Sequence, residues 1–154
     1  MPITLSRRFN HEHVREYGNG DLIFKEGDED RDLFIIQEGV VQIRKNTVQG
    51  EIVLAELLRG DFFGDMALLQ NIPRFASAYS KGKTKVLVLQ PGGFLLKIRR
   101  DPTFAFEMLQ QLSARVKVSS EKFLEGVQSG KISSEVAEEI LNSSAVAMSR
   151  DGSA

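Results

Sequence analysis

The sequence predicts a mainly β protein with C-terminal helices, in which an antiparallel β jelly roll or barrel is flanked by α-helices. Two observations predict this fold class. Between residues 21 and 90, short apolar runs alternate with turns rich in Gly and Asp at intervals of ~8–12 residues, which is typical of antiparallel barrels. Beyond residue 92 the apolar residues recur at helical spacing instead.

Five apolar runs are the predicted strands. They are bounded by turns at Gly27, Glu38-Gly39 and Gly60, where glycine supplies the positive φ angles that tight turns need. The last run is apolar on both faces, which predicts a strand covered on both sides. The runs span residues 22–24, 33–36, 40–44, 52–55 and 86–89.

Three helical segments are expected after the strands. A short one lies near residues 94–98. A longer one begins at Asp101-Pro102, because Asp caps a helix and Pro suits its first position, and it ends near Gly126 and Gly130. A last short helix covers residues 133–141, and the Ser- and Ala-rich tail beyond it is expected to fray.

One apolar stripe runs along the longer helix at steps of 3, 4, 7 and 4 residues. It skips one helical position, which is occupied by Ser119. The stripe is interpreted as part of a core or as a seam between two copies of the chain, in preference to a lid over a ligand. Its members are Leu109, Leu112, Val116, Phe123 and Val127.

These segments divide the chain into three zones. Residues 1–20 are polar with scattered apolar positions and are expected to form a helix or arm. Residues 21–128 hold the β-roll and the long helix. Residues 129–154 hold the short helix and a flexible tail.

Composition narrows the function classes. The 154 residues suit one domain, and a net charge of −1 gives no global attraction for nucleic acid or an anionic membrane. The absence of cysteine excludes disulfides, thiolate metal ligands and a cysteine nucleophile. No run has the length of a signal peptide or approaches the ~20 apolar residues of a membrane span. We therefore expect a cytoplasmic protein without a membrane segment.

The two histidines argue against an enzyme. A cupin-like metal site needs His ligands on the strands, whereas His11 and His13 both precede the predicted barrel. No Ser-His-Asp triad is available, because no histidine follows His13. We expect neither catalysis, nor a metal site, nor a cofactor.

The segment from residue 62 to 78 carries the chemistry. A helix that begins just after Gly64 would present free amide N–H groups and the positive end of its dipole to an anion. Arg74 supplies a planar fork suited to two phosphate oxygens, although an isolated Arg is more often solvated or ion-paired. Asp65 accepts hydrogen bonds from sugar hydroxyls, or it caps the helix. Together these parts suit a phosphate next to a ribose.

This segment resembles the phosphate-binding cassette of the cyclic-nucleotide-binding superfamily, whose usual form is F-G-E-[L/I]-A-L-[L/I], a short gap, then P-R-[A/S/T]-A-[S/T]. Residues 20–39 resemble the early strands of that family, and the similarity extends from about residue 15 to residue 128. The matching cassette positions are Phe63, Gly64, Ala67, Leu68, Leu69, Pro73, Arg74, Ala76 and Ser77.

The resemblance implies a cyclic-nucleotide-binding β-roll that acts as a regulatory or sensor domain in signal transduction. The family includes catabolite-activator-like and kinase-regulatory-subunit-like branches. The ligand it implies is cAMP or cGMP. The residues it assigns to the ligand are Gly64, Asp65, Met66, Ala67, Arg74, Phe75 and Ala76.

Two departures from the family pattern bear on the ligand. Asp65 stands where the family has a ribose-binding Glu, and it is shorter by one C–C bond, roughly 1.5 Å. The ribose contact then becomes long or water-mediated. Phe75 stands where members that prefer cGMP often carry Thr, so the resemblance favours cAMP, while the Phe75 amide remains available to the phosphate.

The long helix extends the resemblance. Residues 112–114 and 118–122 are similar to the helix of the catabolite-activator-like branch, in which two matching hydroxyl residues contact adenine, one of them across a dimer. Ser119 and Ser120 are therefore candidate base contacts, with solvated helix positions as the alternative. The family's long helix commonly pairs with its twin, which implies a homodimer through residues 103–128.

One alternative function remains. Because Asp65 departs from the family pattern, the domain could have lost its ligand and serve as a dimerisation or protein-interaction module.

Binding to nucleic acid is a separate question. Relatives of the activator type add a helix-turn-helix after the long helix, whereas residues 129–154 contain one expected helix. We expect no direct contact with nucleic acid, and the sequence leaves open whether the chain is complete or a fragment.

Overall fold

A computed structural model describes residues 12–151 of the protein, with side chains described as far as Ser143. The chain forms two compact units that divide between Met108 and Leu109. The division falls inside the long helix, so the second unit takes most of a helix that the sequence analysis grouped with the β-roll.

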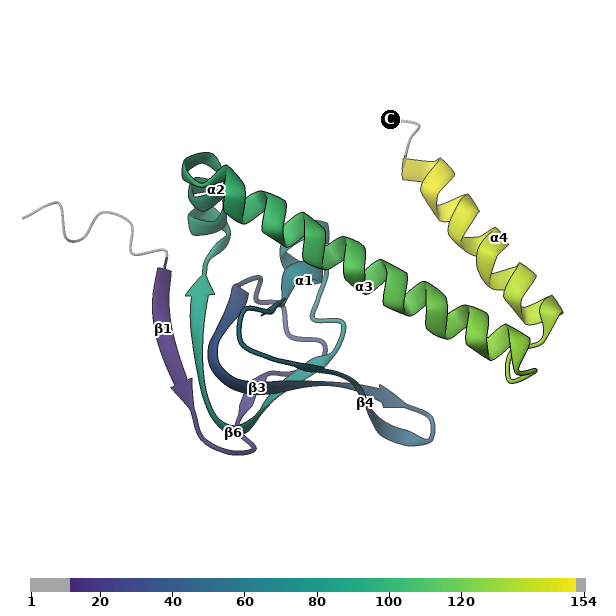
Figure 1. The fold of residues 1–154 in the computed structure, drawn as a ribbon, viewed down its shortest axis with the longest axis horizontal. Coiled ribbons are helices and arrows are strands. Elements are labelled where there is room, and N and C mark those ends of the chain that lie inside the picture. The colour runs from purple at the N-terminus through teal and green to yellow at the C-terminus, as the bar shows by residue number, and fades with distance from the viewer. Residues whose placement is uncertain (1–11, 152–154) are drawn as a thin grey trace, which may run out of the picture. The chain divides into compact units, whose positions relative to one another are not determined.

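The first unit is built on one sheet of six strands, and every pair of neighbours is antiparallel. The order across the sheet is β1-β6-β3-β4 (Figure 1). β2 pairs with β6, and β5 pairs with β3. This confirms the predicted β-roll with flanking helices. The strands are β1 (Glu12–Tyr17), β2 (Leu22–Phe24), β3 (Leu33–Thr47), β4 (Gly50–Leu57), β5 (Phe62–Phe63) and β6 (Ser77–Leu89).

The N-terminal zone differs from the prediction. Residues 12–17 were expected in a helix or arm, but they form strand β1, while residues 1–11 lie outside the described part of the chain. β1 pairs with the end of β6 from Glu12 opposite Leu89 to Tyr17 opposite Thr84. The prediction was wrong because a strand edge far along the chain, rather than local periodicity, decides this conformation.

A bulge joins two strands that the sequence separated. Glu38-Gly39 was interpreted as a turn, but β3 runs through it, and the register against β6 shifts on both sides of Glu38. Gly39 has a φ of 90°, and a Cβ there would lie 2.5 Å from the Lys83 carbonyl oxygen. Glycine is therefore required for a close approach of two strands, which bends β3 instead of ending it.

Three phenylalanines form the centre of the core beside the cassette. The rings of Phe34 and Phe63 stack with centroids 5.0 Å apart, and Phe24 lies 5.6 Å from Phe34 and 5.8 Å from Phe63. All three are buried, together with Ile36, Val86 and other apolar residues of the sheet. Because they come from β2, β3 and β5, they tie these strands together where the cassette begins.

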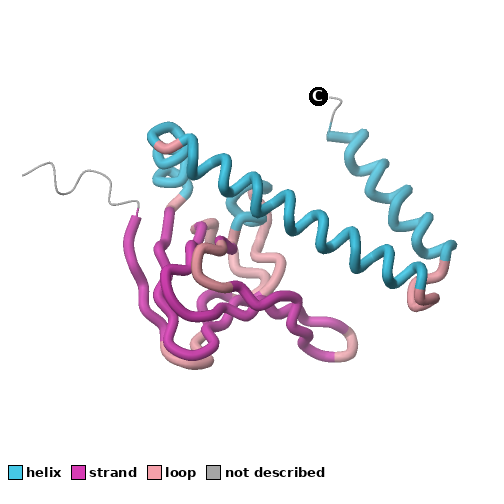
Figure 2. The backbone as a smooth tube through the Cα atoms, in the orientation of Figure 1, coloured by secondary structure: helices cyan, strands magenta, loops and turns pink. Residues whose placement is uncertain are grey.

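The C-terminal helices are coloured cyan in Figure 2, and the first of them begins before residues 94–98, where it was expected. Helix α2 (Pro91–Arg100) has Pro at its first turn, and α3 (Pro102–Gln128) begins at Pro102. Asp101 caps α3, since its Oδ1 accepts a hydrogen bond from the Phe104 amide at 3.1 Å.

The second unit contains the rest of α3 and helix α4 (Ser134–Asp151). Ile132 packs against Gly126, and the Ile132 amide donates to the Gly126 carbonyl at 2.9 Å. Ser133 Oγ accepts a hydrogen bond from the Val136 amide at 3.3 Å and caps α4 as expected. The helix runs beyond residue 141 to Asp151, so the tail that was expected to fray is helical, because the Ser- and Ala-rich segment contains no Gly or Pro to end it before Gly152.

Candidate ligand site

The cassette begins where β5 ends at Gly64. Gly64 has a left-handed φ of 84° and leads into α1 (Asp65–Gln70), a helix of six residues. A Cβ on Gly64 would lie 2.8 Å from Arg74 Nη1 and 2.8 Å from the Asp32 carbonyl oxygen. The turn therefore needs glycine for two reasons: the backbone angle and the close approach of Arg74.

Arg74 lies inside the protein, and its side chain is 1% exposed. Its Nε and Nη2 donate to the two carboxylate oxygens of Asp30 at 3.2 and 2.5 Å. Nη1 donates to the Gly64 carbonyl at 3.0 Å, and Nη2 also donates to the Asp32 carbonyl at 2.8 Å. The Arg74 guanidinium, which was expected to face a phosphate, is therefore paired with the carboxylate of Asp30 in this structure.

The backbone and ring contacts of Arg74 fix it further. Its amide donates to the Asp28 carbonyl, and its carbonyl accepts from the Gly27 amide, both at 2.8 Å. The guanidinium carbon lies 4.2 Å from the centroid of the Phe24 ring. The loop between β2 and β3 (residues 25–32) thus holds Arg74 through both its main chain and its side chain.

A hollow of about 490 Å³ lies beside this ion pair. Four acidic residues line it, whereas Arg15 is the one basic residue among those that do. The acidic lining disfavours an anion in this hollow. The residues lining the hollow are Arg15, Ile23, Phe24, Asp28, Glu29, Asp30, Asp32 and Phe34.

The remaining cassette positions differ in exposure. Asp65 is the first residue of α1, and the helix cap is Gly64, which has no capping side chain, so Asp65 does not take the N-cap position. Ala67 and Ala76 are buried, and Met66 is 38% exposed. The two alanines can therefore contact a ligand only through their backbone. The side chain of Asp65 is half-buried and that of Met66 is exposed, so these two residues can also use their side chains.

Phe75 is held by a lysine from β3. Lys45 Nζ lies 4.2 Å from the centroid of the Phe75 ring and donates to the Phe75 carbonyl at 2.7 Å. The same ammonium group forms an ion pair with Glu26. The hydrogen bond from Lys45 has the largest effect in lowering the pKa of the Glu26 carboxyl, and the hydrogen bond from the Asn46 amide has the next largest.

Ser119 and Ser120 are exposed on α3 and belong to the second unit. The structure brings Gly64 and Arg74 into contact, but the two serines belong to a different unit from the cassette. Their role as base contacts stays a prediction.

Sequence reasoning missed the residues that control Arg74. The sequence analysis named neither Asp30 nor Asp32, and it did not name Lys45, which contacts Phe75. An acidic run of four carboxylates within residues 28–32 was the available signal, because a buried Arg requires a carboxylate partner.

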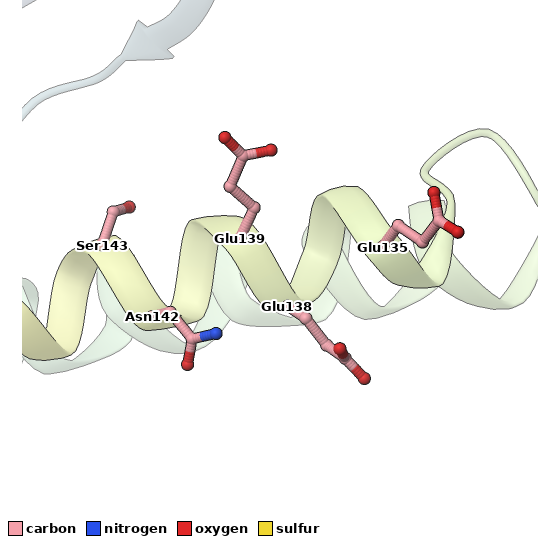
Figure 3. A pocket seen from close by; sticks show the side chains of 5 residues that line it. All are labelled: Glu135, Glu138, Glu139, Asn142 and Ser143. Carbon is pink, nitrogen blue, oxygen red and sulfur yellow. The ribbon is translucent and has the colours of Figure 1, made fainter.

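Other features of the described residues do not form a second site. A shallow hollow on α4 is lined by three glutamates, but Glu138 and Asn142 point to one side of the helix while Glu139 and Ser143 point to the other (Figure 3). Within residues 12–151, no three His, Asp or Glu side chains are placed to hold a metal. His13 accepts a hydrogen bond from Arg15, and His11 lies outside the described residues. None of the described helices has the length and apolar character needed to cross a membrane.

The six-stranded antiparallel roll and the Gly64–Arg74 cassette define a class of nucleotide-binding regulatory domains. Residues 14–101, more than half of the chain, match the family model described as the cyclic nucleotide-binding domain. The chain therefore belongs to the cyclic nucleotide-binding domain family. Domains of this family bind cyclic nucleotides and are themselves non-catalytic, and the role they serve is regulatory.

Two curated relatives support this assignment. The chain is 42% identical over 71 residues to a cAMP-dependent protein kinase regulatory subunit of Mycosarcoma maydis, which covers 46% of this chain and 14% of the relative. It is 35% identical over 104 residues to the cyclic AMP receptor protein of Thermus thermophilus, which covers 67% of this chain and 48% of the relative. The chain thus spans less than half the length of both proteins.

Two solved structures share the fold of this chain. The catabolite activator protein of Thermus thermophilus superposes with a TM-score of 0.66 at 32% identity, over 73% of this chain and 54% of that one. A cyclic nucleotide-binding domain from Methylobacillus flagellatus superposes with a TM-score of 0.67 at 23% identity, over 76% and 68% of the two chains, and supports the fold.

Proposed function

We propose that this domain is a sensor that binds cAMP in preference to cGMP, with the cyclic phosphate held between the cassette and Arg74. One observation carries the proposal: a buried guanidinium, fixed by Asp30, donates through Nη1 to the carbonyl of the cassette glycine Gly64. A cation that is already buried and oriented binds an anion without the cost of ordering a flexible side chain.

The contact between Arg74 and the phosphate follows from the donors of Arg74. Arg74 has five N–H donors, and four of them are directed at Asp30, Asp32 and Gly64. Nη1 carries the fifth, on the atom that contacts the cassette. A phosphate oxygen is expected to take this N–H, because the other donors are already directed at Asp30, Asp32 and Gly64.

The sugar and base contacts are proposed from the resemblance to the family. Asp65 accepts hydrogen bonds from the ribose hydroxyl, directly or through a water molecule, because its side chain is one carbon shorter than Glu. Phe75 lacks the hydroxyl that would hold guanine, which favours adenine. Ser119 and Ser120 are assigned to the base, and their hydroxyls can donate and accept.

The regulatory step requires two states of different ligand affinity. Binding shifts the population toward the state that orders residues 64–76 around the phosphate, by no more than the difference in affinity between the states. We also propose that the active form is a homodimer through α3. Leu109 and Val116, seven residues apart on this helix, are 62% and 65% exposed. The proposed role is cytoplasmic and without direct nucleic-acid contact, because a net charge of −1 gives no global attraction for nucleic acid.

A second candidate is a domain that serves only as an interaction module. The bidentate pairing of Arg74 with Asp30 favours it, because the carboxylate already satisfies the fork that a phosphate would occupy. In that case the cassette is a structural element and no cyclic nucleotide binds.

Titration calorimetry with cAMP, cGMP and AMP distinguishes these functions. We expect cAMP to bind more tightly than cGMP and AMP to bind weakly, because AMP lacks the cyclic phosphate. A ligand present at 100 times its Kd should stabilise the fold by about 2.7 kcal/mol in a thermal shift. Equal binding of AMP and cAMP would contradict the cassette assignment, and no binding of any of the three would favour the interaction module.

A further inference from the structure

The backbone that leads out of the cassette is held at two consecutive carbonyl groups by residues outside it. The Gly27 amide donates to the Arg74 carbonyl at 2.8 Å. The next carbonyl along the chain, that of Phe75, accepts a hydrogen bond from Lys45 Nζ at 2.7 Å. The directions of these two carbonyls are therefore set by one donor from the loop between β2 and β3 and by one donor from β3.

Fixing these carbonyls also fixes the amides that follow them. A trans peptide group is planar, and its C=O and N–H bonds point in opposite directions. None of the described peptide bonds is cis, so the Phe75 N–H points away from Gly27 and the Ala76 N–H points away from Lys45. Within residues 12–151, the structure gives neither amide a hydrogen-bond acceptor. Both donors are therefore oriented and available to a ligand.

Lys45 is itself held in place by Glu26. The Glu26 carboxylate accepts from the ammonium group of Lys45 and from the Asn46 amide, the latter at 3.2 Å. The side chains of Lys45 and Glu26 are only 28% and 20% exposed, so salt screens this ion pair less than one at the surface. The Glu26 amide donates to Ser77 Oγ at 2.8 Å, which links the pair to the start of β6. The ammonium group is thus anchored on the side opposite to the carbonyl that it holds.

We infer, on the basis of the proposed function, that Lys45 is a positioning residue of the phosphate site: it orients the Phe75–Ala76 peptide group so that the Ala76 N–H is presented to the cyclic phosphate. Ala76 is buried, so its backbone is the part that it can offer to a ligand. Lys45 does not touch the ligand in this assignment. A donor that is oriented before binding does not have to be ordered by the ligand, and this increases the affinity.

This role has a consequence that other roles of Lys45 do not share. The Ala76 amide would bind the phosphate, so losing its orientation should weaken every ligand that carries a cyclic phosphate by the same factor. A lysine that acted on the base would affect only ligands that have a base. A lysine that merely stabilised the fold would lower the melting temperature without changing the affinity.

Calorimetry on the full chain tests the inference with cAMP and a base-free ribose 3′,5′-cyclic phosphate. We expect Lys45→Met to weaken both ligands equally, by roughly 2- to 30-fold, the range for residues that modulate a site without touching its ligand. Lys45→Arg should recover most of the affinity, because it keeps the charge and has donors for both Glu26 and the Phe75 carbonyl. Glu26→Gln should weaken binding less than Lys45→Met, since an amide oxygen still accepts from Lys45.

The Ala76 amide provides a second, spectroscopic readout. In the wild type, saturating cAMP should move the Ala76 amide proton downfield in a ¹⁵N–¹H spectrum, as a hydrogen bond to a phosphate oxygen requires. In Lys45→Met at saturating cAMP the shift should be smaller, because the amide is no longer held in one direction. A purely structural role of Lys45 would leave the shift unchanged.

Lys81→Met is the matched control. Lys81 also forms an ion pair with a glutamate across the sheet, at 2.9 Å from Glu56, but this pair joins β6 to β4 rather than to the cassette. The change from lysine to methionine is the same. It should leave the affinity for both ligands and the Ala76 shift as in the wild type.

Three results would overturn the inference. Unchanged affinity in Lys45→Met would show that the lysine only stabilises the fold, and if that variant did not fold, unchanged affinity in Glu26→Gln would have the same meaning. A loss confined to cAMP would show that Lys45 acts on the base. If the wild-type chain bound neither ligand, the proposed function would fail as well, whereas the first two results leave that function standing.

Discussion

Arg74 and Asp30 form a two-point ion pair in which the guanidinium is 1% exposed and the carboxylate side chain is 44% exposed. The carboxylate partly neutralises the charge that a phosphate would meet. We expect Asp30→Asn to raise the affinity for cAMP and to lower the melting temperature, because the site becomes more positive while a charged hydrogen bond is lost.

Calorimetry and a thermal melt of the same preparation measure the two effects. Glu29→Gln is a suitable control, since it removes a carboxylate from the lining of the same hollow. A fall in affinity in Asp30→Asn would instead identify Asp30 as a residue that positions Arg74 for the ligand.

Arg74 itself should be essential to binding. We expect Arg74→Ala to weaken cAMP binding by about 2–5 kcal/mol, the usual effect of removing one partner of a buried charge pair. Arg74→Lys should restore part of the affinity, because it keeps the charge but not the fork. Both variants should also melt earlier, since Asp30 and the Gly64 and Asp32 carbonyls lose their donor.

Titration calorimetry of variants whose circular dichroism shows a folded sheet provides the measurement. Arg99→Ala, which removes an exposed arginine from the last turn of α2, should bind normally. Unchanged affinity in Arg74→Ala would refute the site.

The cassette turn should tolerate no side chain at Gly64. Gly64→Ala places a Cβ 2.8 Å from Arg74 Nη1 and from the Asp32 carbonyl, in addition to the strain of a φ of 84°. Gly60→Ala is the matched control, since Gly60 has a φ of 89° and a Cβ there would meet nothing within 4 Å.

Urea unfolding of the two variants separates the causes. Gly60→Ala should lose about 1 kcal/mol from backbone strain alone, and Gly64→Ala should lose more. Equal losses would show that the contact with Arg74 contributes nothing.

Stability at acid pH should depend on Glu26. Its pKa is lowered first by the hydrogen bond from Lys45, so the folded protein holds the charged carboxylate more strongly than the unfolded chain does. The stabilisation is complete above the unfolded pKa of about 4.3 and disappears as the pH falls through the lower folded pKa. Urea midpoints of wild type and Glu26→Gln should therefore differ at pH 6 and converge at strongly acid pH. A difference that stays constant down to acid pH would contradict this assignment.

The helix seam is testable in solution. We expect Leu109→Glu and Val116→Glu to convert a dimer into a monomer in light scattering, because a charge in an apolar helix seam is costly. Gln110→Glu adds the same charge at a neighbouring exposed position and should leave the dimer intact. A wild-type monomer would refute the homodimer.

The sequence by itself determined the β-roll, the starts of α3 and α4 and the position of the cassette, because these depend on local features. Gly64 needs a positive φ, Asp101 caps the helix that follows it, and short apolar runs alternate with turns. Such signals lie within a few residues of the structure they specify.

Only the tertiary structure decided which residues, far apart in the sequence, contact one another. Residues 12–17 form a strand because the edge of β6 is available more than sixty residues later. Arg74 is paired with Asp30, 44 residues earlier, because a buried guanidinium beside the Phe24 and Phe34 rings and two carbonyls needs a carboxylate. Burial created that requirement, and burial arises only when the strands have come together.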